Sequence, residues 1–324
     1  MMIVQGVFRS GTSVLFRTLA HDSAWTCYYE PLHPDLLDHV SEAEAANPSH
    51  PKSSLYAPYQ AVQPRLQEAF SPSFSTDHAT LEAEDSAAPL RSYLTLLTEN
   101  RATTVLQFNR AFWMTSWLQS AVPEACFLHL VRDPRSVVWS QLTTSSGSRV
   151  RMDWPLLGRV FSFSSGDLSK VFSPHAYHGA YEIKDYLRLG LNRFSDRSDD
   201  IRAWAYDCLH AAQSHRPYVQ ALAVWGAQVR VCHHEAQAAF GENYRCLRYE
   251  DLCDTPISTL KRVYDLCDRP LPSSVRQYAG DHIHRESVAA WEEVDGAREH
   301  FRRGVRQAGI APVLEDVGYD HLLE

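Results

Sequence analysis

Short apolar segments alternate with helical patterns along this chain, and this alternation strongly limits the folds open to it. Near the amino terminus, residues 3–8 have the pattern of a buried strand, residues 9–13 of a tight loop and residues 14–21 of a helix. Further strand patterns lie at residues 26–29, 103–108, 125–131 and 244–249, and further helical patterns at residues 90–99, 112–121, 203–212, 218–240 and 256–267. This order predicts an α/β fold with a parallel sheet flanked by helices, whose ligands bind beyond the carboxyl ends of the strands.

Two stretches interrupt this order. Residues 34–89 are dominated by Ala, Ser, Pro and acidic residues, and residues 145–200 carry many aromatic and Arg side chains. We expect both stretches to be irregular or short-helical excursions from the sheet that cover a cleft. Because no linker and no internal repeat separates two halves, we predict a single domain over residues 1–324.

The composition excludes several classes of protein. With 44% hydrophobic and 22% charged residues the chain can form an ordinary core, and it has no apolar window of about 18 residues that would predict a membrane span. The formal net charge of −8 argues against a broad nucleic-acid surface. The amino terminus has no secretory pattern and the seven Cys show no Cys-x-x-Cys spacing, so we expect a cytoplasmic protein with reduced cysteines.

The segments rich in His do not predict a metal site. The runs from Cys232 to Glu235 and from His282 to His284 match no known spacing of zinc ligands. We therefore predict that the protein holds no metal.

The segment from Gly6 to Ser13 has the strand, glycine loop and helix context of a phosphate-binding loop. In the nucleotide-triphosphatase form of this loop a Lys follows the second Gly, whereas here that position is Thr12 and the basic residue is Arg9. No strand pattern ends in an Asp suited to Mg²⁺. Taken alone, the segment is compatible with a simple glycine turn and with a loop that binds a phosphate-like group without Mg²⁺.

A second motif follows the most apolar of the strand patterns. Asp133 is a suitable N-cap and Pro134 a suitable first residue of a helix, which places Arg132 at the carboxyl end of the strand. Ser136 and Ser140 lie four residues apart, on one face of that helix. Arg132 and a Ser hydroxyl can therefore meet at one anion, although this segment, taken alone, is more simply explained as a capped helix start with a surface Arg.

The two motifs, with the segment from Cys27 to His33 between them, resemble the sulfotransferases that use 3′-phosphoadenosine-5′-phosphosulfate (PAPS). The resemblance is strongest to the carbohydrate and tyrosylprotein branches and their bacterial relatives, and the run from His129 to Arg135 is close to the carbohydrate form. It implies a P-loop-type sulfotransferase fold, PAPS as co-substrate, transfer of a sulfuryl group to a hydroxyl or an amine, and no metal. The resemblance is weakest in the two excursions, which we expect on the acceptor side.

The resemblance also implies a donor site and a general base. The loop from Arg9 to Ser13 corresponds to the family's 5′-phosphosulfate loop, and Arg132 with Ser140 to its 3′-phosphate ligands. Glu30 follows the second strand at the position of the general base. The candidate cofactor-binding residues are therefore Arg9, Ser10, Gly11, Thr12, Ser13, Arg132 and Ser140, and the candidate catalytic residues are Glu30, Arg9 and Arg110.

The main departure from the family lies after the third strand. Gln107 stands where relatives often have a Lys that contacts the transferring group, and Asn109 where the small-molecule branch has a His base. A carboxamide cannot act as a general base, which favours Glu30. Arg110 matches a basic residue of the carbohydrate branch and could compensate for Gln107 together with Arg9.

Two other functions remain compatible with the sequence. A P-loop kinase or phosphotransferase is opposed by Thr12 and by the missing Mg²⁺ carboxylate, and a non-catalytic nucleotide-binding protein of the same fold is favoured only by Gln107. The acceptor can be a small molecule, a sugar or a peptide with a hydroxyl, and neither its identity nor the oligomeric state follows from the sequence.

Overall fold

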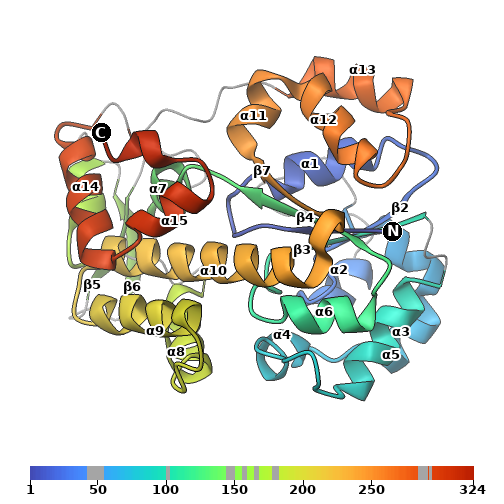
Figure 1. The fold of residues 1–324 in the computed structure, drawn as a ribbon, viewed down its shortest axis with the longest axis horizontal. Coiled ribbons are helices and arrows are strands. Elements are labelled where there is room, and N and C mark those ends of the chain that lie inside the picture. The colour runs from blue at the N-terminus through green and yellow to red at the C-terminus, as the bar shows by residue number, and fades with distance from the viewer. Residues whose placement is uncertain are drawn as a thin grey trace. The chain divides into compact units, whose positions relative to one another are not determined.

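The computed structural model of the chain describes residues 1–41, 55–99, 103–143, 150–154, 159–163, 168–176, 182–283, 291 and 294–324 (Figure 1). The strands are β1 (Met2–Gln5), β2 (Thr26–Tyr29), β3 (Thr104–Phe108), β4 (Cys126–Val131), β5 (Val150–Trp154), β6 (Arg159–Phe163) and β7 (Tyr244–Arg248). The helices of eight or more residues are α1 (Thr12–Leu19), α5 (Ala88–Leu97), α7 (Pro134–Leu142), α8 (Ile183–Arg193), α9 (Asp200–Ala212), α10 (Pro217–Phe240), α12 (Pro256–Asp265), α13 (Ser273–His282) and α14 (Ala297–Ala308). The shorter helices are α2 (Leu36–Ser41), α3 (Gln63–Ala69), α4 (Phe74–Asp77), α6 (Thr115–Ala121), α11 (Tyr249–Asp254) and α15 (Ala311–Asp316), with 3₁₀ turns η1 (Ala57–Val62), η3 (Leu168–Phe172), η5 (Gly241–Asn243) and η6 (Asp320–Leu322).

A five-stranded sheet of order β2-β3-β1-β4-β7 organises the fold. Strand β1 pairs in parallel with β3 and β4, and β2 pairs in parallel with β3. Helices α1, α12 and α13 lie over one face of the sheet, and α3, α5 and α6 over the other (Figure 1). The predicted α/β class, with a parallel sheet flanked by helices, is confirmed.

The described chain divides into two compact units. Unit 1 comprises Met1–Val7, Gly11–Leu130 and Cys232–His284, and it contains the sheet and the helices on its faces. Unit 2 comprises Phe8–Ser10, Val131–Val231 and Arg285–Glu324, with α7, α8, α9, α14 and α15. The single domain expected over residues 1–324 stays a prediction.

The core of unit 1 forms around strands that are covered on both faces. All six residues of β4 are buried, as expected for a parallel strand whose sequence is a nearly continuous apolar run. Trp117 of α6 and Tyr93 of α5 are fully buried, and their polar atoms donate to the carbonyls of Asp85 at 2.9 Å and Pro31 at 2.8 Å. These large side chains therefore enter the core without leaving a buried donor unpaired.

In unit 2, glycines allow α14 to pack closely against neighbouring helices. A Cβ at Gly304 would overlap the Leu222 side chain of α10, so this position has no room for a larger residue. Gly309 ends α14 at a φ of +68°, and its carbonyl accepts the Trp204 indole N–H of α9 at 3.1 Å.

The two expected excursions differ in structure. In the first, residues 34–41 and 55–89 hold short helices and turns and no strand, as predicted. The second contains the helix α8, in keeping with the expected helical excursion, and the antiparallel pair of β5 and β6, which the sequence analysis did not predict. The alternation of Val150, Met152 and Trp154 is a strand signal that the expectation of an irregular stretch overlooked.

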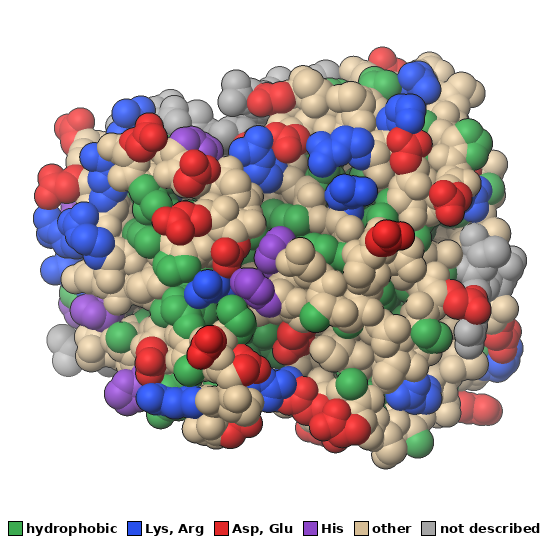
Figure 2. Space-filling model, viewed as in Figure 1, with side chains coloured by type: hydrophobic (Ala, Val, Ile, Leu, Met, Phe, Trp, Pro, Cys, Tyr) green, Lys and Arg blue, Asp and Glu red, His purple; other side chains and the backbone are tan. Residues whose placement is uncertain are grey.

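Among the described residues, no helix is both long enough and apolar enough to cross a bilayer. On the face shown in Figure 2, acidic and basic side chains are interspersed.

Candidate active site

The loop after β1 leads directly into α1, as the phosphate-loop motif predicts. Gly11 is the N-cap of α1 with a φ of +93°, a conformation that glycine adopts without a steric penalty. A Cβ at Gly11 would overlap the ring of Tyr249, which packs against the loop. Since no side chain caps the helix, its first N–H groups are not covered by a capping oxygen and can face an anion.

The rest of the loop belongs to unit 2. Arg9 and Ser10 lie in unit 2 and Gly11 in unit 1, so the loop joins the two units along the chain. The side chain of Ser10 is fully buried, and its hydroxyl makes no hydrogen bond within the described part of the chain. A buried hydroxyl without a partner is costly unless a ligand or water satisfies it.

In unit 1, both carboxylate oxygens of Glu30 are held by donors. Asn109 Nδ2 donates to Oε1 at 2.5 Å, and Arg110 Nη1 forms an ion pair with Oε2. Glu30, Asn109 and Arg110 are each less than one-tenth exposed. The two donors together fix the direction of the carboxylate. In a poorly solvated site such an ion pair is stable only if its geometry is good.

Asn109 connects this carboxylate to the loop. Its Oδ1 accepts from Thr12 Oγ1 at 3.0 Å and from Gln107 Nε2 at 3.1 Å, while its Nδ2 donates to Glu30. Thr12 is the first residue of α1, so the helix start and the carboxylate share one buried polar network. Ser13, the next loop residue, exchanges a 2.7 Å hydrogen bond with the Tyr29 hydroxyl.

The backbone is strained at two of the candidate catalytic residues. Glu30 has a φ of +44° directly after β2, and Arg9 has a φ of +74° in the loop after β1. A left-handed conformation costs a non-glycine residue on the order of 1–3 kcal/mol, and such outliers cluster at functional sites. The Glu30 N–H still donates to the Gln107 carbonyl at 2.9 Å, so the strand pairing holds the residue in this conformation.

Two tyrosines near Glu30 are unsuited to act as a base in its place. Burial, followed by the charge of Glu30, raises the pKa of the Tyr29 and Tyr56 hydroxyls above their usual range. Both hydroxyls therefore stay protonated at ordinary pH.

A second polar cluster lies within unit 2. Arg9 Nε donates to Ser140 Oγ at 2.7 Å, and Arg132 Nη1 donates to the Arg9 carbonyl at 3.1 Å. Asp133 caps α7 by accepting from the Arg135 N–H at 2.8 Å, as the motif predicted, so Arg132 stands between the end of β4 and the start of α7. Arg9 thus contacts Ser140 through its guanidinium group and Arg132 through its backbone carbonyl.

A comparison with known protein families finds a match in the amino-terminal part of the chain. Residues 2–156 match the profile described as "Sulfotransferase family". Over these residues, which make up just under half of the chain, the sequence is similar to the sulfotransferase family. The matched segment contains every candidate site residue named above from Arg9 to Ser140. No curated protein sequence matches the chain.

Some solved sulfotransferases are distantly similar. The sulfotransferase domain from the curacin biosynthetic pathway has 15% identity and a TM-score of 0.44, covering 95% of this chain and 97% of that one. A sulfotransferase from Alicyclobacillus acidocaldarius has 14% identity and a TM-score of 0.42, covering 99% and 94%. The sulfotransferase domain from the Synechococcus PCC 7002 olefin synthase has 15% identity and a TM-score of 0.38, covering 85% and 75%. At these TM-scores the similarities carry no weight, so the fold rests on the chain's own sheet.

The structure places six of the residues expected from the sequence in two groups. Thr12, Glu30 and Arg110 share the network of unit 1, and Arg9, Arg132 and Ser140 share the cluster of unit 2. Sequence reasoning missed the role of Asn109, which it treated only as a residue unable to be a base. The motif offered no signal for that role, because it depends on the left-handed turn at Glu30.

Replacing Asn109 tests whether its amide positions Glu30. Asn109→Leu removes the donor to Glu30 and should lower kcat by about 10- to 150-fold, the effect of losing a hydrogen bond to a charged group. Asn109→Asp keeps the acceptor for Thr12 and Gln107 but replaces the donor to Glu30 by a carboxylate that repels it, so it should be at least as impaired as Asn109→Leu. We would measure kcat, KM and the affinity for adenosine 3′,5′-bisphosphate. The affinity for this nucleotide should stay within a few-fold of the wild-type value. Near-normal kcat for Asn109→Asp would show that Asn109 only anchors the loop.

Proposed function

We propose that this chain is a PAPS-dependent sulfotransferase that transfers a sulfuryl group to a hydroxyl, or an amine, of a small-molecule, sugar or peptide acceptor. The observation that carries the proposal is the buried network in which Asn109 links the Glu30 carboxylate to Thr12 at the start of α1. Sulfuryl transfer needs a base that takes the acceptor proton and a site that binds an anion. The network joins a carboxylate that suits the first task to a helix start that suits the second. The carbohydrate or tyrosylprotein branch and the cytoplasmic location expected from the sequence stay predictions.

The residues present fit the donor. The loop offers the first N–H groups of α1, the unpartnered Ser10 hydroxyl and the Arg9 guanidinium to the 5′-phosphosulfate. Arg132 and Ser140 are our assignment for the 3′-phosphate, supported by their common contact with Arg9. The absence of the triphosphatase Lys at Thr12 suits a phosphosulfate, which carries less charge than a triphosphate.

Glu30, Arg9 and Arg110 have different roles in the proposed reaction. Glu30 accepts the proton of the acceptor group as the acceptor oxygen or nitrogen forms its bond to sulfur. The bond between sulfur and the phosphate oxygen breaks, and adenosine 3′,5′-bisphosphate leaves with the electron pair. Arg9 and the α1 amides stabilise charge on the transferring group and on the leaving phosphate. In this structure Arg110 holds Glu30, and it would need to release the carboxylate partly as the proton arrives.

The direct test is to incubate the purified protein with PAPS and a library of hydroxyl and amine acceptors. Release of adenosine 3′,5′-bisphosphate together with a product heavier by one sulfuryl group would establish the activity by mass spectrometry. A thermal-shift comparison should show stabilisation by adenosine 3′,5′-bisphosphate and little by ATP with Mg²⁺. The reverse result would favour a phosphotransferase, and binding without turnover on any acceptor would favour a non-catalytic nucleotide-binding protein.

A further inference from the structure

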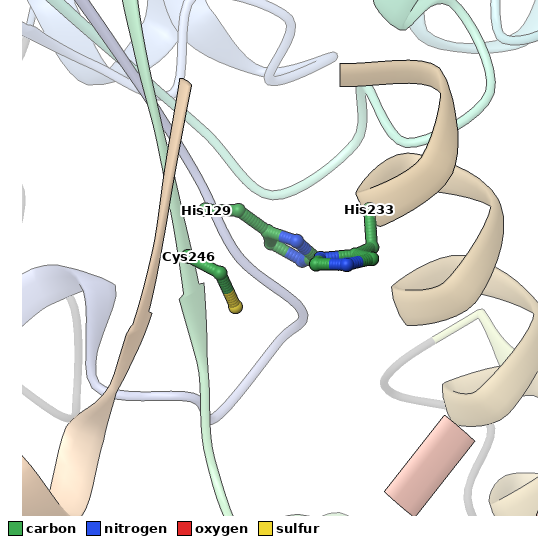
Figure 3. Close-up of side chains that lie close together, drawn as sticks. All are labelled: His129, His233 and Cys246. Atoms are coloured by element: carbon green, nitrogen blue, oxygen red, sulfur yellow. The ribbon is translucent and has the colours of Figure 1, made fainter. Parts of the chain in front are cut away.

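A cluster of two imidazoles and a thiol lies in unit 1, apart from the residues assigned to sulfuryl transfer. One ring nitrogen each of His129 and His233, and the sulfur of Cys246, lie within 4.8 Å of one another (Figure 3). Figure 3 shows the two rings approaching each other, with the Cys246 sulfur beside them. The three residues come from three different elements, β4, α10 and β7.

The environment of His129 suits a ligand better than a structural histidine. His129 is fully buried, and its Nε2 has no hydrogen-bond partner within the described part of the chain. Its Nδ1 lies 3.5 Å from the Tyr244 hydroxyl.

The Tyr244 hydroxyl lies between the two imidazoles. It is 2.8 Å from His233 Nδ1, in addition to its longer approach to His129. A single hydroxyl carries one proton, so it can donate to only one of these rings at a time. Its oxygen can accept an N–H from the other ring, so the hydroxyl can orient both rings, as an outer partner does for the His ligands of a metal.

The cluster is also accessible from one side. His233, Tyr244 and Cys246 are partly exposed, whereas His129 forms the buried end. An ion can thus enter past Cys246 without unfolding the sheet, and Cys246 is a free thiol.

We propose that His129, His233 and Cys246 bind a single thiophilic metal ion, Zn²⁺ or Cu⁺. Two imidazole nitrogens and a thiolate are a ligand set that these ions prefer, whereas Mg²⁺ and Ca²⁺ require oxygen ligands. On binding, the Cys246 thiol loses its proton to solvent and a sulfur–metal bond forms. Zn²⁺ would take a water as its fourth ligand, whereas Cu⁺ with one thiolate is neutral and is complete with three ligands.

A metal site here differs from the expectation of no metal, because that expectation rested only on the spacing of neighbouring His and Cys residues in the sequence. The motif Cys232 to Glu235 contributes only His233, and the other ligands lie on separate strands, so no spacing rule could find the set. The ion would join β4, β7 and α10 and has no part in the sulfuryl transfer proposed above. Loss of metal binding and loss of transferase activity are therefore separate results.

The test is a metal titration of the full chain after removal of metal by a chelator. Zn²⁺ would be titrated against a chromogenic chelator, and Cu⁺ without oxygen against bicinchoninate. We expect one equivalent to bind and the unfolding temperature to rise. X-ray absorption of the loaded protein should show one sulfur and at least two nitrogen neighbours. The ion that binds more tightly distinguishes the zinc arm from the copper arm.

Matched variants locate the ion. His233→Asn and Cys246→Ser should weaken binding by at least about 10-fold. His234→Asn, at the adjacent position of the same helix, and Cys253→Ser should bind as the wild type does. Circular dichroism would show that each variant is folded, which we expect because both positions are partly exposed. The proposal is overturned if neither ion binds stoichiometrically, or if His234→Asn loses as much affinity as His233→Asn.

Discussion

Replacing Glu30 by Gln should lower kcat by about 10²- to 10⁴-fold, the usual contribution of a general base. The variant has nearly the same shape but cannot accept the acceptor proton. The affinity for adenosine 3′,5′-bisphosphate should change little, because Glu30 contacts Asn109 and Arg110 rather than the residues assigned to the nucleotide. Steady-state kinetics and calorimetric titration with the product nucleotide would measure the two quantities.

The variant also has a structural cost that must be separated from catalysis. Gln at position 30 leaves the buried Arg110 charge without its counter-ion, and disrupting one partner of such a pair destabilises a protein by about 3–5 kcal/mol. Urea unfolding should reveal this loss, while nucleotide binding shows that the remaining protein is native. Glu30→Asp keeps the charge and draws the carboxylate back by one methylene, so it should recover stability more fully than kcat.

Glu99 supplies a matched control in the same unit. It also forms an ion pair with an Arg, Arg65, but this pair is exposed to solvent. Glu99→Gln should therefore leave both kcat and stability close to those of the wild type. If Glu30→Gln turns over within a few-fold of wild type, Glu30 is not the base, whatever its contacts.

The sequence predicted the sheet and the loop because both depend on local patterns. The β2 strand was predicted at its observed residues, and the glycine of the loop and the Asp133 cap appear where the motifs placed them. Strand and helix periodicity and capping chemistry are local properties, so they can be seen without knowing the partners of each segment.

The contacts of the site could not be predicted in the same way. Parallel pairing of Tyr29 with Gln107 sets the register of β2 and β3, and this register brings Glu30 beside Asn109 and Arg110. Nothing in the alternation of strands and helices specifies that register. The positive φ of Glu30 turns its side chain toward these donors, and only the three-dimensional structure shows that turn. The sequence therefore named Glu30 and Arg110 without showing that one holds the other.

Replacing Arg132 by Gln should instead act on nucleotide binding. If Arg132 binds the 3′-phosphate, its loss should weaken the affinity for adenosine 3′,5′-bisphosphate by about 1.5–3 kcal/mol, or about 10- to 150-fold. At saturating PAPS the variant should keep most of the wild-type kcat, because Arg132 has no assigned part in proton transfer. Arg132→Lys should be intermediate, since an ammonium keeps the charge but loses the planar fork of donors.

Because Arg132 also contacts the loop, its effect on the 3′-phosphate must be separated from an effect on the loop. Arg132 also donates to the Arg9 carbonyl, so its removal could weaken binding by loosening the loop. AMP lacks the 3′-phosphate and separates the two effects: Arg132→Gln should bind AMP as the wild type does if its role is direct. Arg306→Gln, an exposed position on α14 of the same unit, controls for the loss of one positive charge. Equal losses of affinity for AMP and for adenosine 3′,5′-bisphosphate would assign Arg132 to the loop, and unchanged affinity for both would remove it from the site.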